Sequence, residues 1–189
     1  MKALISLASE FQKYFEENQW KFCFIGGIAL QQWGEPRLTN YIDISLLTGF
    51  GAEEVFIDRI LSIYESRVEN GKEFALKSRV LLLKASSGIG IDIALAGLPF
   101  EEDVFKRSLN KEFLPGIFLR VCTAEDLIIF KAFADRSRDW SDLDGILIRQ
   151  RSHLDWSYIQ KQLTPLCVVK EAPHILPRLE KMRKELTLE

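Results

Sequence analysis

The most constraining stretch of this 189-residue chain is residues 22–47, where two apolar runs flank a Gly-Gly pair. Phe22–Ile25 is short and apolar, as expected of a strand, and the glycines end it. Ile28–Trp33 then predicts a short helix, and Tyr41–Leu47 predicts a second strand. The order strand, glycine turn, helix and strand fixes how the chain enters and leaves the first part of a sheet.

One carboxylate interrupts the second of these strands. Because side chains alternate between the two faces of a strand, Asp43 shares a face with Tyr41 and Ser45 and not with its isoleucine neighbours. Asp92 repeats the pattern in the strand predicted over residues 89–95. An isolated acid is costly in an apolar strand, so each Asp predicts a face that opens onto a cleft, a metal ion or a cation. A structural pair with a nearby arginine and an exposed sheet edge are the alternatives.

The other elements follow from apolar spacing and from capping signals such as Thr123-Ala124-Glu125-Asp126. We expect further helices over 3–17, 53–64, 100–109, 123–135, 141–151, 156–169 and 175–186, and further strands over 80–83 and 117–121. Residues 65–78 predict a loop with a short strand at 74–76. The pattern favours an α+β fold, with a short mixed β-sheet of about five strands flanked by helices and a C-terminal helical bundle. Residues 1–122 would form the α/β core, and residues 123–189 a helical part packed on it as a single compact unit.

Composition restricts the class of protein further. Hydrophobic residues make up 47% of the chain and charged residues 28%, as in ordinary globular domains. The formal net charge of −2 excludes bulk attraction to nucleic acid but leaves room for a local basic groove. We expect no membrane span and no signal peptide. The three cysteines are far apart in apolar surroundings, so we expect buried thiols in a cytoplasmic protein.

Several segments, taken in order, resemble a known family. They are 24–30 (FIGGIAL), 33–39 (WGEPRLT), 42–44 (IDI), 91–93 (IDI) with 96–101 (AGLPFE), and 124–142. Together they resemble the nucleotidyltransferases of the DNA polymerase beta superfamily. The closest resemblance is to the small bacterial group that includes the toxins of type IV abortive-infection systems. It covers about residues 20–150 and implies the nucleotidyltransferase fold.

The resemblance assigns roles to the glycine pair and to the two acids. It implies that backbone N–H groups of Gly26 and Gly27 face a triphosphate, which amides at a helix N-terminus can do; a tight turn is the alternative. It implies that Asp43 and Asp92 hold Mg²⁺ and are catalytic. Tyr41 takes the position of the family's first acid, and a neutral phenol is a poor ligand for Mg²⁺. The sequence therefore predicts an incomplete metal site, and the alternatives are impaired catalysis, another acid that substitutes, or a protein that works by binding.

A second set of candidate site residues comes from the predicted helix over 123–135 and from the charged residues that follow it. Lys131 lies in an apolar helical run, and the resemblance implies a catalytic role for it at the nucleotide phosphates. A snorkelling side chain or an internal pair with Asp135 is the alternative. Asp139 and Asp142 are three residues apart and can share one helical face. The resemblance implies that they lie beside the site and contact the nucleotide, with an exposed helix start as the alternative.

Arg37 and Thr39 lead into the strand that carries the first aspartate, where we expect contact with phosphate or substrate. A turn held by hydrogen bonds is the alternative. The predicted function is transfer of a nucleotidyl group from a nucleoside triphosphate (NTP), with Mg²⁺, to a hydroxyl of RNA (including tRNA), protein or a small molecule. One alternative is a nucleotidyltransferase-fold binding protein with impaired catalysis. The other is the toxin of a toxin–antitoxin pair, with an antitoxin-like protein as its partner.

Overall fold

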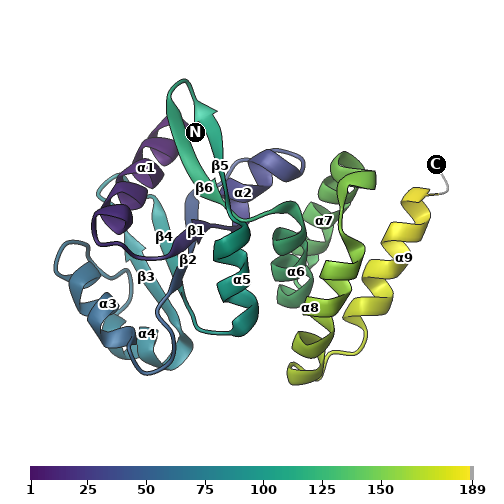
Figure 1. Cartoon of the computed structure of the whole chain (residues 1–189). Coiled ribbons are helices and arrows are strands. Elements are labelled where there is room, and N and C mark those ends of the chain that lie inside the picture. Colours follow the sequence, from purple (N-terminus) through teal and green to yellow (C-terminus); the bar gives the residue numbers. More distant parts are fainter. Residues whose placement is uncertain (188–189) are drawn as a thin grey trace. The chain divides into compact units, whose positions relative to one another are not determined.

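The computed structural model describes residues 1–187 and divides into two compact units (Figure 1). Residues 1–28 and 38–122 form the first unit. Residues 29–37, together with the described residues from Thr123 onward, form the second. Helix α2 (Gly26–Trp33) begins in the first unit, and its later residues belong to the second.

Among the described residues, the first unit contains a mixed six-stranded sheet in the order β3-β4-β2-β1-β6-β5. The strands are β1 (Phe22–Phe24), β2 (Tyr41–Leu47), β3 (Val80–Lys84), β4 (Gly90–Ala96), β5 (Leu109–Leu114) and β6 (Ile117–Val121). The pairs β2/β4 and β1/β6 are parallel, and the other neighbouring strands are antiparallel. The predicted α+β class and mixed sheet are therefore confirmed, with β5 as a strand that the sequence did not predict.

Strand β2 shows why these residues enter the sheet. Ile42, Ile44 and Leu46 are fully buried, while Asp43 on the other face is partly exposed and Tyr41 is 49% exposed. Burial of each large aliphatic side chain contributes about 1.5–3 kcal/mol, so the isoleucine face holds the strand against the core. The alternate face is left for the polar residues at the start of the strand.

The helices of the first unit cover the sheet and its edge. They are α1 (Lys2–Glu17), α3 (Glu53–Leu61), α4 (Gly71–Ser78), α5 (Pro99–Arg107) and the start of α2. Helix α1 contacts β2, β5 and β6, α4 contacts β3, and α5 contacts β1. The strand predicted at 74–76 is wrong, because these residues lie within α4. Phe74 and Leu76 are 41% and 39% exposed and only Ala75 is buried, so the apolar triplet lies on a surface helix.

The second unit is helical. It contains α6 (Ala124–Ala134), α7 (Ser137–Gln150), a short 3-10 helix (Arg151–His153), α8 (Trp156–Val169) and α9 (Ile175–Thr187). Helix α6 contacts each of the other three α-helices, and most of its residues are buried. The predicted cap is confirmed, because the hydroxyl oxygen of Thr123 accepts a hydrogen bond from the Asp126 amide at 3.3 Å.

Two predictions from composition can be compared with the structure. Cys23, Cys122 and Cys167 are buried thiols, and burial raises the pKa of the Cys167 thiol. Within residues 1–187, every helix is too short or too polar to cross a bilayer.

Candidate functional site

Asp43 and Asp92 are register partners on the parallel strands β2 and β4. Paired residues of neighbouring strands point to the same face, about 4.8 Å apart along the hydrogen-bonding direction. The two carboxylates therefore share one face of the sheet. The next row on this face pairs Tyr41 with Gly90, one pleat earlier along both strands.

The glycine pair touches the first of these acids. The amide of Gly27 donates a hydrogen bond to Oδ2 of Asp43 at 3.2 Å, which places a carboxylate at the N-terminus of α2. Gly26 has φ +54°, and a Cβ atom added to it would lie 2.2 Å from the same oxygen. Only glycine fits this position, because a side chain would be strained and would displace the carboxylate. The position of the Asp43 carboxylate therefore depends on the glycine turn that begins α2.

Thr39 completes this side of the site. A Cβ atom added to Gly27 would lie 3.1 Å from the Thr39 side chain, so the threonine packs against the first turn of α2. The hydroxyl oxygen of Thr39 also accepts a hydrogen bond from the amide of Tyr41 at 3.2 Å. Thr39 thus orders the entry to β2, and it lies close enough to the glycine pair to contribute to a ligand there.

A residue that sequence reasoning missed, Arg67, lies beside the second acid. Its Nη1 atom is 2.8 Å from Oδ1 of Asp92, and its guanidinium lies over the ring of Tyr41 at 5.3 Å from the centroid. The backbone positions it, because the Arg67 amide donates to the carbonyl of Leu82 on β3 at 3.0 Å. The arginine alternative considered for an isolated acid is therefore realised at Asp92.

These contacts decide what metal chemistry fits. Among the residues that the structure describes, no group of three or more Asp, Glu, His or Cys side chains is arranged to hold a metal ion. Because Tyr41, in the next row on this face, is a neutral phenol and Arg67 pairs with Asp92, the donors do not suit two metal ions. Two neighbouring carboxylates do suit a single Mg²⁺, which usually takes one or two carboxylates and completes its shell with water and phosphate oxygens.

The remaining predicted residues form an ion cluster within the second unit. Nζ of Lys131 on α6 lies 2.5 Å from Asp142 and 3.1 Å from Asp139, both on α7. Arg37 binds Asp142 through two hydrogen bonds of 2.8 and 2.9 Å, and Arg136 binds Asp139 at 2.6 Å. The cluster pairs each buried charge with an opposite one, as a low-dielectric interior requires.

Two details of this cluster differ from the alternatives considered. Lys131 pairs with Asp139 and Asp142, whereas Asp135 accepts hydrogen bonds from Trp140 at 2.7 Å and lies 2.7 Å from His174. Asp139 and Asp142 share a face of α7 as predicted, but both are buried and neither forms an exposed helix start. Burial raises the pKa of Asp142, yet hydrogen bonds from Arg37 and Lys131 outweigh it, so the net effect is a lowered pKa.

The predicted residues thus fall into two groups, one in each unit. Those of the first unit are Gly26, Gly27, Thr39, Asp43 and Asp92, and those of the second are Arg37, Lys131, Asp139 and Asp142. Arg67 joins the first group. In the sequence, Arg67 is one cation near the start of the polar stretch 65–78 that precedes β3. Without the fold, nothing distinguishes it from other surface arginines.

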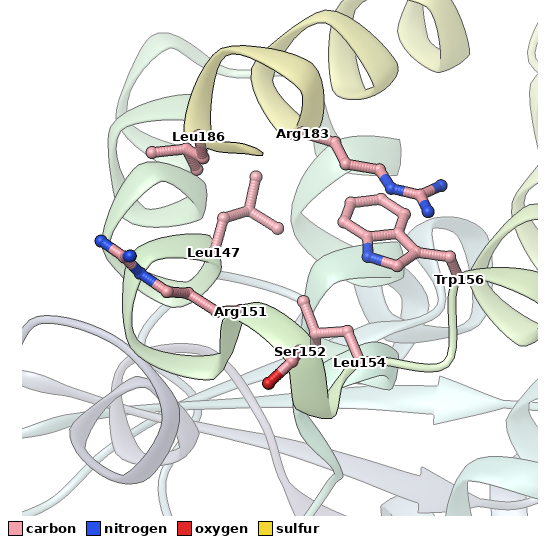
Figure 2. Close-up of a pocket in the computed structure, with 7 residues that line it drawn as sticks. All are labelled: Leu147, Arg151, Ser152, Leu154, Trp156, Arg183 and Leu186. Atoms are coloured by element: carbon pink, nitrogen blue, oxygen red, sulfur yellow. The ribbon is translucent and has the colours of Figure 1, made fainter. Parts of the chain in front are cut away.

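The second unit also contains a cavity of about 480 Å³ that involves none of the predicted residues (Figure 2). It is lined by Leu147, Arg151, Ser152, Leu154, Trp156, Arg183 and Leu186. Figure 2 shows Arg183 beside the indole of Trp156, and its guanidinium lies 4.5 Å from the ring centroid. Arg183 also pairs with Glu180 at 3.6 Å. We place the candidate site at the paired acids because they carry chemistry that these side chains lack.

The sheet order, the paired acids on parallel strands and the glycine turn at a helix N-terminus define the class: the chain has the nucleotidyltransferase fold. Solved structures agree. An antigenic nucleotidyltransferase-like protein from Paracoccidioides brasiliensis is 13% identical with a TM-score of 0.53, covering 94% of this chain and 92% of that one. The antibiotic-resistance factor ANT(2'')-Ia, in complex with adenylyl-2''-tobramycin, is 15% identical with a TM-score of 0.50, covering 98% and 97%. A solution structure of ANT(2'')-Ia has the same TM-score of 0.50 at 14% identity, covering 98% and 92%. No protein-family model and no curated protein sequence matches the chain.

Proposed function

We propose that the chain binds a nucleoside triphosphate with Mg²⁺ and transfers the nucleotidyl group to the hydroxyl of an acceptor. The observation that carries this proposal is the register pairing of Asp43 with Asp92 beside the N-terminus of α2. The fold is shared with ANT(2'')-Ia, whose structure contains adenylyl-2''-tobramycin, and this supports the reaction class.

Each residue of the first unit has a role in this proposal. Asp43 and Asp92 would hold one Mg²⁺, which supplies charge neutralisation at the phosphates when it is bound. Gly26 and Gly27 would bring the triphosphate to the first turn of α2, where amide groups and the helix dipole favour anions; the Gly27 amide, which donates to Asp43, would be shared with it. Thr39 would donate its hydroxyl to a phosphate oxygen from the neighbouring loop.

The chemical step is an in-line displacement at the α-phosphorus. The hydroxyl oxygen of the acceptor bonds to this phosphorus, and its proton passes to water. The bond between the α-phosphorus and the bridging oxygen breaks, and pyrophosphate leaves with that electron pair. Positioning and electrostatics supply most of the rate in reactions of this class, so a missing carboxylate slows the step without changing its course.

The roles that the resemblance implies for Arg37, Lys131, Asp139 and Asp142 are also part of the proposal. Lys131 would stabilise charge at the phosphates, and the other three would support it. Because two carboxylates already hold its ammonium, this role requires Lys131 to exchange one of them for a phosphate. A Lys131→Met variant that folds should then bind the nucleotide more weakly, and unchanged affinity would leave the cluster a purely structural role.

The test is transfer of label from an α-phosphate-labelled NTP, combined with thermal stabilisation by each NTP with and without Mg²⁺. We expect Mg²⁺-dependent stabilisation in the wild type and its loss in Asp43→Asn, since the amide still accepts the Gly27 hydrogen bond but carries no charge. Asp103→Asn serves as the matched control, because Asp103 is a partly exposed acid on α5 that pairs with a surface lysine, Lys106, at 3.1 Å. An absence of Mg²⁺-dependent stabilisation by every NTP would count against the proposal.

A binding protein with impaired catalysis is the second candidate, and Tyr41 and Arg67 favour it. Both reduce the negative charge available to a metal at the paired acids. This candidate shares the NTP-binding result and differs only in turnover. If labelled NTP stabilises the protein but neither labelled product nor pyrophosphate is formed, this result supports the binding protein.

The toxin of a toxin–antitoxin pair, neutralised by an antitoxin-like protein, stays a prediction from the sequence resemblance. Growth arrest on expression, relieved by co-expression of an adjacent small gene, is the result that would support it. Normal growth under strong expression would oppose it.

A further inference from the structure

A pocket of about 390 Å³ lies beside the paired acids in the first unit and has a basic lining. Its residues are Asn40, Tyr41, Arg67, Lys84, Gly88 and Gly90. The charged side chains in this lining, Arg67 and Lys84, are both cations. We propose that this pocket takes the acceptor, and that the acceptor is a small hydroxyl-bearing molecule with a carboxylate or phosphate group. The inference rests on the proposed function, because it names the substrate of that reaction.

The register of three neighbouring strands brings residues of the pocket lining together. Lys84 pairs with Gly90 across β3 and β4, and Gly90 pairs with Tyr41 across β4 and β2. These three positions form one row on the face that carries the acids, directly next to the row of Leu82, Asp92 and Asp43. A ligand whose anionic group is bound in the row of Lys84, Gly90 and Tyr41 would therefore hold its hydroxyl group within one pleat of the two carboxylates. This places the pocket where an acceptor must be.

Gly90 is the floor of the pocket. A Cβ atom added to it would lie 2.7 Å from Nη1 of Arg67 and 2.7 Å from two ring atoms of Tyr41. The absence of a side chain lets the guanidinium and the phenol ring lie over the strand. The ring offers an apolar wall for the carbon skeleton of a ligand, and the two cations in the lining offer hydrogen-bond donors.

Charge then selects the ligand. Asp92 contacts one nitrogen of Arg67, and a guanidinium has five N–H donors, so donors remain for a second anion. Lys84 at the end of β3 is exposed, and its ammonium can move toward the pocket. A polyamine acceptor such as tobramycin would meet like charges here. A large nucleic acid is disfavoured by the formal net charge of −2, which gives little phosphate attraction beyond these two side chains.

The experiment titrates anions into the full chain without Mg²⁺, in the absence and presence of a non-hydrolysable NTP analogue. The probes are inorganic phosphate, glycerol 3-phosphate and glycerate, with glycerol and tobramycin as neutral and cationic comparisons. The variants are Lys84→Met and the matched control Lys77→Met, an exposed lysine on α4. We expect the anions to bind with or without the analogue, and Lys84→Met to weaken them about tenfold while Lys77→Met does not.

Three outcomes would overturn the inference: displacement of phosphate by the analogue, equal affinity in Lys84→Met and Lys77→Met, or tighter binding of tobramycin than of glycerol 3-phosphate. Displacement would assign the pocket to the nucleotide. Mg²⁺-dependent stabilisation by the NTP is measured separately on the same protein preparations, and Lys84→Met should retain it. The proposed function therefore fails or holds independently of the anion result. Label recovered in glycerol 3-phosphate or glycerate supports the inference, and label recovered in RNA opposes it.

Discussion

The guanidinium of Arg67 lies 2.8 Å from a carboxylate oxygen of Asp92, so one of the two acids on the open face of the sheet already has a cation. This contact distinguishes the site from one designed for two metal ions. In the proposed function, Asp43 and Oδ2 of Asp92 would then be the ligands of a single ion. It also brings a positive charge over the ring of Tyr41, at 5.3 Å from the ring centroid.

The first prediction concerns competition between this arginine and Mg²⁺. Arg67→Met removes the competing cation, so we expect Mg²⁺ in the presence of NTP to bind about threefold more tightly, the effect of a partly exposed ion pair. The midpoint of thermal stabilisation against Mg²⁺ concentration measures this change. Arg138→Met, an exposed arginine on α7, is the control. An unchanged or raised midpoint in Arg67→Met would mean that Asp92 is not a ligand.

The second prediction concerns the missing acid. Tyr41→Asp places a third carboxylate on the same face as Asp43 and Asp92, so label transfer from NTP should rise by at least about tenfold. Tyr41→Phe removes only the hydroxyl and should leave the rate unchanged. The rate is measured at saturating Mg²⁺ with each variant. If the natural chain already transfers label as fast as Tyr41→Asp, the tyrosine does not limit the chemistry.

The third prediction separates backbone strain from the close contact at the glycine turn. Gly26→Ala introduces a strained residue and a clash with Asp43, whereas Gly116→Ala introduces only strain, since Gly116 has φ +76° and open space around it. We expect Gly116→Ala to lower the free energy of unfolding by about 1–2 kcal/mol, and Gly26→Ala by at least about 1 kcal/mol more. Denaturant unfolding measures both. Equal losses would show that the contact with Asp43 is not tight.

The fourth prediction is a pH dependence within the second unit. Hydrogen bonds from Arg37 and Lys131 lower the pKa of Asp142 against the opposing effect of burial. Because the folded pKa is lower than the unfolded one, the stability that Asp142 contributes is present above about pH 4 and is lost as the pH falls through the folded pKa. Asp142→Asn should therefore unfold more easily at pH 7, and its stability should fall less between pH 5 and the acid limit.

Denaturant midpoints of the wild type and Asp142→Asn, measured at several pH values, test this prediction. The loss at pH 7 should be about 3–5 kcal/mol, because the substitution leaves Lys131 and Arg37 with fewer partners for their charges. Asp144→Asn, an exposed acid on the same helix, is the control. Parallel pH curves for the wild type and Asp142→Asn would contradict the prediction.

Strand β2 was predictable from the sequence, and β5 was not, for the same physical reason. The alternating isoleucines at 42 and 44 indicate a strand with one buried face. The bounds predicted for β2 from the sequence are the bounds found in the structure. Residues 109–114 lie at the edge of the sheet with both faces at least partly exposed. Hydrogen bonds to β6 hold this strand, and they leave no trace in its side chains.

The candidate site shows a similar limit. Asp43 and Asp92 stood out as single acids in apolar strands, and their register follows once the two strands are neighbours. Arg67 could not be predicted, because its position depends on a non-local hydrogen bond between its amide and Leu82. The pairing of Lys131 with α7 and not with Asp135 likewise depends on how two helices pack.

A crystal structure of the chain with Mn²⁺ and a non-hydrolysable NTP analogue would test the paired acids most directly. We predict one anomalous peak at about 2.0–2.2 Å from an oxygen of Asp43 and an oxygen of Asp92, with the phosphates against the first turn of α2. A cation bound elsewhere, or a nucleotide bound without contact to either carboxylate, would contradict the assignment of this face as the nucleotide site.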